Sequence, residues 1–78
     1  MTYDEARSKV RQFPTEADWD SYGAEPTSQR AMVSAILMLH AMEAAGLPCP
    51  FPVPTVSGGI EFEWFDEDHS DYHIAVPA

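Results

Sequence analysis

The sequence is poor in cysteine and in basic residues. A single cysteine among 78 residues excludes an internal disulfide and zinc sites of the Cys₄ or Cys₂His₂ type. Four Lys and Arg against thirteen Asp and Glu give a net charge of -9, and no basic residue follows Arg30. Because proteins bind DNA or RNA by neutralising phosphates with cations, this composition argues against direct nucleic-acid binding, and an anionic membrane surface would repel the chain.

Long hydrophobic runs are also missing. The longest uninterrupted apolar stretch, Ala35 to Leu39, is far below the roughly 20 residues that cross a bilayer. The first residues are charged and lack the apolar segment of a signal peptide. We therefore expect a soluble intracellular protein, with residues 1–78 forming one small α+β domain.

Two helices are expected. Thr2 and Glu5 have the spacing of a capping box, which predicts a short helix over about residues 3–12. The main helix is expected to begin after Ser28 and to end near Ala45. It is apolar on most sides, and such a helix is normally covered on most sides. We expect the sheet and the first helix to cover it, or a second copy to do so in a homodimer.

Three strands follow in the C-terminal half. Prolines at every second position from Pro48 to Pro54 remove the N–H donors of one strand edge, which predicts an edge strand or a polyproline II segment. Residues 60–64 and 72–76 alternate between apolar and polar, which predicts a β-hairpin. Its inward side chains are expected to be Ile60, Phe62, Trp64, Tyr72, Ile74 and Val76. The predicted fold is a long apolar helix and a short N-terminal helix on a small three-stranded antiparallel sheet.

The segment between the helices combines large aromatic rings with turn-forming residues. We interpret it as an ordered loop whose rings lie over the core, with Asp20 or Ser21 bonding nearby backbone N–H groups. The residues expected to have structural roles in the loop and the sheet are Trp19, Asp20, Tyr22, Gly23, Phe62 and Trp64.

Two motifs resemble a known group of proteins. The first is Trp-Asp-x-Tyr-Gly-Ala-x-Pro at 19–26, and the second is Pro-Thr-x-x-Gly-Gly-Ile-x-x-Glu-Trp at 54–64. Together they resemble small uncharacterised proteins encoded in bacterial and phage genomes, over roughly residues 18–65. The resemblance implies a bacterial or phage origin and a shared fold, and it carries over no catalytic residue. With a soluble intracellular chain, we expect the protein in the cytoplasm of a bacterial host cell.

The hairpin contains two candidate metal sites. Asp66, Asp68 and Ser70 are spaced like the start of an EF-hand, but Asp71 stands where that motif needs glycine and Pro77 where it needs glutamate. The alternative, zinc at His69 and His73 with Asp66 or Asp71, competes with an ordinary cross-strand pairing of His73 with glutamate. We predict a solvated hairpin tip, with no metal and no other cofactor.

The sequence also contains residue types that act in catalysis in other proteins. Cys49 has no basic neighbour in sequence and lies in an acidic chain, which favours the protonated thiol of a packed cysteine. Ser57 lacks the Gly-x-Ser-x-Gly pattern of a nucleophile turn. Glu61 with Glu63 could act as an acid–base pair only in a water-excluding pocket, which a chain of this size rarely has. His40 is expected to be packed or at an interface. We therefore predict no catalytic residue and no enzyme activity.

Acidic residues of the hairpin are the candidate binding residues. The six are Glu61, Glu63, Asp66, Glu67, Asp68 and Asp71. Such an array can imitate a phosphate backbone and dock on a basic protein surface. The expected function is inhibition of a nucleic-acid-binding or defence protein, in the manner of an anti-CRISPR protein encoded by a phage or mobile element. The alternative is a small homodimeric assembly protein, or an antitoxin-like protein, whose acidity serves only solubility.

Overall fold

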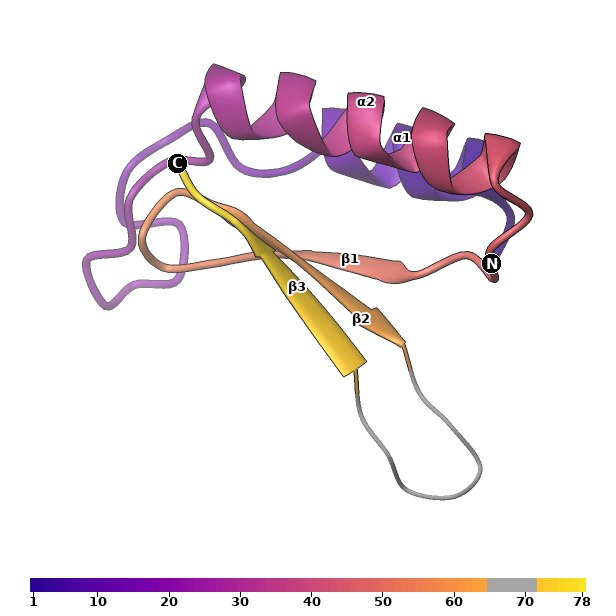
Figure 1. Cartoon of the computed structure of the whole chain (residues 1–78). Helices are drawn as coiled ribbons and strands as arrows, with labels where there is room; N and C mark the ends of the chain where they lie inside the picture. Colours follow the sequence, from indigo (N-terminus) through magenta and orange to yellow (C-terminus); the bar gives the residue numbers. More distant parts are fainter. Residues whose placement is uncertain (65–71) are drawn as a thin grey trace.

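The computed structural model describes residues 1–64 and 72–78. Two helices lie on one face of a three-stranded antiparallel sheet, which confirms the predicted α+β class (Figure 1). The helices are α1 (Tyr3–Arg11) and α2 (Gln29–Ala44). The strands are β1 (Phe51–Pro54), β2 (Ile60–Trp64) and β3 (Tyr72–Val76), in the order β1–β2–β3.

Helix α1 begins at the predicted capping box. The Glu5 backbone N–H donates to Thr2 Oγ1 at 3.1 Å, and the Thr2 N–H donates to Glu5 Oε1 at 2.9 Å. These two bonds satisfy donors that a helix start leaves without partners. The helix buries Ala6 and Val10 in the core. The local signals therefore place the helix start where it was predicted.

Helix α2 is defined by a cap at each end. Ser28 Oγ accepts from the Ala31 N–H at 3.0 Å. At the other end Gly46 takes φ 74°, and the N–H groups of Gly46 and Leu47 donate to Glu43 O and Met42 O at 3.0 and 3.1 Å. This is a Schellman motif, which needs a left-handed residue at the glycine position. Neither helix in the described part of the chain is long and apolar enough to span a membrane.

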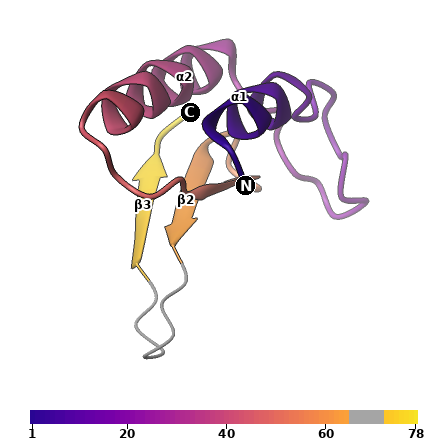
Figure 2. The ribbon, with the colours of Figure 1, turned by 90° about the vertical axis from the view of Figure 1, so that its right-hand side faces the viewer.

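The core lies between the helices and the inner face of the sheet. Figure 2 shows α1 and α2 side by side above the strands. The ten apolar residues of the buried cluster are Ala6, Val10, Phe13, Ala31, Ala35, Leu39, Met42, Ile60, Phe62 and Val76. Helix α1 contacts β1, whereas α2 contacts β2 and β3. Each helix therefore covers a different part of the sheet.

The cover over β3 is incomplete. Tyr72 and Ile74 lie opposite Trp64 and Phe62, on the face that carries the core, yet they are 61% and 43% exposed. Figure 1 shows that β2 and β3 diverge from the helices toward the end of β2 and the start of β3. The expectation that Tyr72 and Ile74 are buried is therefore wrong, because the helical layer does not reach them. Val76, at the other end of the strand, is buried as expected.

Candidate functional site

The outer face of the sheet carries two neighbouring carboxylates of the central strand. Glu61 lies between Val53 and Ala75, and Glu63 lies between Phe51 and His73. Because side chains alternate along a strand, both glutamates point away from the helices and from buried Phe62. The strand rise places their Cα atoms roughly 7 Å apart. The flanking strands leave both side chains half-buried.

Two of the three basic residues of α1, Arg7 and Lys9, contact other side chains. The Arg7 guanidinium is buried and pairs with Asp4 and with Glu43 Oε1, the latter at 3.0 Å. Its hydrogen bonds to these two carboxylates raise the pKa of Arg7 above its ordinary value. Lys9 Nζ lies 5.0 Å from the centroid of the Phe51 ring. Within residues 1–64 and 72–78, the ion pairs are those of Arg7, so Glu61 and Glu63 form no salt bridge in this part of the chain.

The remaining acidic candidates lie outside the described residues. They are Asp66, Glu67, Asp68 and Asp71, together with His69 of the candidate zinc site. The structure therefore brings together Glu61 and Glu63 of the six predicted binding residues. His73 is exposed on the outer face, opposite Glu63. In the part of the chain that the structure describes, no group of three His, Cys, Asp or Glu side chains is arranged to hold a metal ion.

The loop between the helices is held by its own carboxylates. Asp20 Oδ1 accepts from the N–H groups of Tyr22 and Ala24 at 2.9 and 3.0 Å, which confirms the predicted bonding to local backbone. Asp18 Oδ1 accepts from the Gly23 N–H at 2.6 Å. Trp19 is half-buried, and its Nε1 donates to Glu25 O at 2.7 Å.

Tyr22 does not lie over the core. It is 91% exposed, and Ala24 is the loop residue that is buried. The reason is the turn around it, because Ser21 and Gly23 both take positive φ, 64° and 84°. That backbone path carries Tyr22 outward. The structural role predicted for Asp20 fits this loop, whereas the packing role predicted for the Tyr22 ring is wrong.

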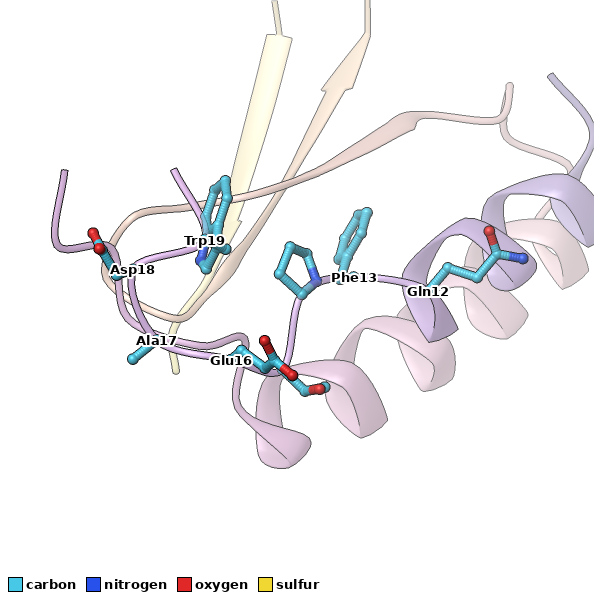
Figure 3. Close-up of a pocket in the computed structure, with 8 residues that line it drawn as sticks. Gln12, Phe13, Glu16, Ala17, Asp18 and Trp19 are labelled. Atoms are coloured by element: carbon cyan, nitrogen blue, oxygen red, sulfur yellow. The ribbon is translucent and has the colours of Figure 1, made fainter. Parts of the chain in front are cut away.

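One open hollow of about 370 Å³ lies beside this loop, lined by residues 12–19. Figure 3 shows the rings of Phe13 and Trp19 pointing the same way from this segment. The ionisable side chains of the lining are the carboxylates of Glu16 and Asp18. All the lining residues are consecutive in the chain, so the hollow is a feature of one loop and brings together no groups from distant elements.

Cys49 and His40 fall in different surroundings. Cys49 is half-buried, and burial raises the pKa of its thiol, which favours the protonated form. Its Sγ donates to Pro50 O, in the next residue of the chain, at 3.3 Å. His40 is exposed on α2, so it is not packed within this chain, and a place at an interface stays a prediction.

Aromatic donors hold the connection between α2 and β1. Trp64 Nε1 donates to Pro48 O at 2.8 Å, and the Tyr3 hydroxyl donates to Leu47 O at 2.8 Å. Trp64 is half-buried and packs against the core, and Phe62 is fully buried beside it. Both residues thus stabilise the fold, as expected. The sequence analysis missed these bonds, because no local pattern pairs residues so far apart in the chain.

The chain was compared with models of protein families, with curated proteins and with solved structures, and none of the three comparisons finds a significant match.

Proposed function

We propose that this chain is a non-catalytic protein that binds a basic surface of another protein through the acidic outer face of its sheet. The observation that carries the proposal is the placement of Glu61 and Glu63 next to each other on the central strand, turned away from the helices. Neighbouring carboxylates on a strand have few backbone degrees of freedom, so less entropy is lost when they meet a cationic partner.

The charge balance supports the same proposal. The chain carries -9 overall, and the basic residue nearest the core, Arg7, is already paired with Asp4 and Glu43. Such a protein attracts a cationic groove over a distance of about one Debye length, and salt weakens that attraction. We infer that the partner is a nucleic-acid-binding or defence protein in the cytoplasm of a bacterial host cell, inhibited by a phage- or mobile-element-encoded mimic of nucleic acid. The other acidic residues predicted to bind the partner are Asp66, Glu67, Asp68 and Asp71, which lie outside the described residues.

The test uses a charge-matched pair of double variants. Immobilised full-length protein is incubated with bacterial host lysate at low salt, and bound proteins are eluted with rising salt. Glu61→Gln with Glu63→Gln should abolish capture of basic proteins, whereas Glu16→Gln with Glu25→Gln, which remove the same charge from the loop, should leave it intact. If both double variants lose capture equally, net charge alone explains binding. If neither loses capture, the acidic outer face is not the binding surface.

A second step tests mimicry itself. Duplex DNA added to the captured complex should displace the partner if both occupy one groove. If the partner stays bound at saturating DNA, the result would support protein binding but contradict nucleic-acid mimicry.

A second candidate function rests on the outer side of α2. Val33 and Leu37 are 52% and 63% exposed there. An apolar helix surface of this kind suits a homodimeric assembly protein, or an antitoxin-like protein, whose acidity serves only solubility. Light scattering over a wide concentration range tests this candidate. A Val33→Glu variant should then dissociate the dimer without unfolding the chain.

A further inference from the structure

We propose that two copies of this chain associate by antiparallel pairing of their β3 strands, which joins the two sheets into one. This surface differs from the acidic outer face, and the inference does not rest on the proposed function. The occupant of the β3 edge is a second copy because the strand is complementary to itself, as its register and its charge both indicate.

The two edges of the sheet differ in their backbone donors. Strand β1 pairs with β2 through the register Phe51 with Glu63 and Val53 with Glu61. Pro52 in between has no N–H, so the donors of β1 at Phe51 and Val53 face β2, and the proline positions face outward. The outer edge of β1 therefore cannot donate to an added strand.

Among the described residues no strand pairs with the outer edge of β3, and this edge has its full set of backbone donors. Antiparallel pairing alternates, so Phe62, whose neighbours Glu61 and Glu63 face β1, exchanges hydrogen bonds with Ile74 of β3. The N–H and C=O groups of His73 and Ala75 then face the open edge. Both residues are exposed, and neither is proline. An edge of this kind is a template for strand addition.

Symmetry allows the two-fold axis to lie beside any residue of β3, and the central residue, Ile74, is the position at which all five residues of the strand are paired. A two-fold axis beside Ile74 sets this residue opposite its own copy, His73 opposite the partner's Ala75 and Tyr72 opposite the partner's Val76. Each copy then donates and accepts through His73 and Ala75. On the inner face, Tyr72 and Ile74, now 61% and 43% exposed, meet apolar side chains of the other copy.

Charge permits this contact. A chain with a net charge of -9 repels its own copy at most surfaces. Strand β3 contains no Asp, Glu, Lys or Arg, so the directly opposed pairs carry no like charges. In this register His73 faces the partner's Ala75.

The helical layer fits the same arrangement. The Arg7–Glu43 ion pair marks the side of α2 that faces α1. Helical geometry puts Ser34, Met38 and Ala41 on the opposite side, and all three are uncharged. Because α2 contacts both β2 and β3, whereas α1 contacts β1, this side of α2 lies on the same side of the molecule as the β3 edge.

The test measures the oligomeric state of the full-length protein by sedimentation equilibrium. The unaltered chain should form a dimer. Ile74→Glu, which opposes two like charges at the axis, and Ala75→Pro, which removes a donor used only at the open edge, should each weaken the dimer more than about tenfold. Val56→Glu, on another surface and 62% exposed, and Val33→Glu should leave the dimer intact. Thermal melting checks that each variant remains folded.

A cross-link tests the register directly. Opposed residues in a non-hydrogen-bonded antiparallel pair have Cα atoms about 4.5 Å apart, within the range of a disulfide. In a Cys49→Ser background, Ile74→Cys should form a disulfide dimer under mild oxidation, and Val56→Cys should not. A monomer at all concentrations, a dimer that survives both β3 variants, or one lost in Val33→Glu alone would overturn the proposal.

Discussion

The two ends of the β2–β3 ribbon have the same sequence pattern and different surroundings. Val76, Ile74 and Tyr72 lie on one face of β3, yet their exposed fractions rise from 4% through 43% to 61%. At the first end Val76 is paired with fully buried Ile60. At the other end Tyr72 is paired with half-buried Trp64. Burial therefore changes along a face that the alternation of residues treats as uniform.

The difference comes from what packs on each end. The Glu25 N–H donates to Val56 O at 2.8 Å, and the Ser28 N–H donates to Gly58 O at 2.9 Å, so the inter-helix loop is bound to the β1–β2 turn. Helix α2 begins directly above it. The strands then diverge from the helices along their length (Figure 1). Alternation thus identifies the inner face of a strand, whereas the covering layer decides how much of it is buried.

The largest effect is expected at the centre of the covered part. Phe62 is fully buried within the core cluster, and Phe62→Ala would leave a cavity there. We expect the free energy of unfolding to fall by about 3–5 kcal/mol, measured by urea denaturation. A loss below about 1 kcal/mol would mean that the covered end is as loosely packed as the open one.

The next effect concerns the turn that closes the covered end. A Cβ atom at Gly59 would collide with Val76 O, a backbone atom that cannot move aside easily. Gly59→Ala should therefore lower the free energy of unfolding by about 2–3 kcal/mol. The control is Gly46→Ala, where the added Cβ meets nothing within 4 Å and the cost, about 1 kcal/mol, comes from the positive φ alone. If urea denaturation shows equal losses for Gly59→Ala and Gly46→Ala, the close approach of Gly59 to Val76 O is contradicted.

A smaller effect is expected at Trp64, where the cover ends. The ring is half-buried and its Nε1 donates to Pro48 O at 2.8 Å. Trp64→Ala removes partial apolar burial and one hydrogen bond, so we expect a loss of about 2 kcal/mol in thermal or urea unfolding. Trp64→Phe keeps most of the apolar contact, so about half of the free energy of unfolding lost in Trp64→Ala should be recovered. A loss as large as that of Phe62→Ala would place the boundary of the core further along the ribbon.

The smallest effect is expected at Tyr72. Because this side chain is 61% exposed, Tyr72→Ala should change the stability of the isolated monomer by less than about 1 kcal/mol. The measurement is urea unfolding of the Ala75→Pro variant with and without Tyr72→Ala. Ala75→Pro serves as the background because it removes a backbone donor of the proposed β3 dimer, so that the monomer is measured. A large loss there would show that Tyr72 is buried within its own chain.

The ends of the helices could be predicted from the sequence because their signals are local. Thr2 with Glu5 and Ser28 satisfy backbone donors within one turn of themselves, whatever the rest of the fold does. The outward direction of Glu61 and Glu63 follows from the two-residue period of a strand in the same way. Whether these glutamates bind a partner stays a prediction.

The features that could not be predicted depend on distant parts of the chain. Tyr22 points into solvent because Ser21 and Gly23 turn the backbone, and no pattern of apolar residues encodes that direction. The exposure of Ile74 depends on how far α2 extends over a strand that follows it by about 30 residues. Burial of Arg7 requires Glu43 from the other helix. Each is a tertiary relation, so residue spacing alone does not reveal it.

The alternating prolines of β1 limit how many copies of the chain can join through their sheet edges. If both edges of the sheet could accept strands, copies added edge to edge would form an open fibre. Pro52 and Pro54 leave the outer edge of β1 without the donors that such growth needs. Association through strands can therefore use β3 alone, and once two copies have met there the assembly is closed.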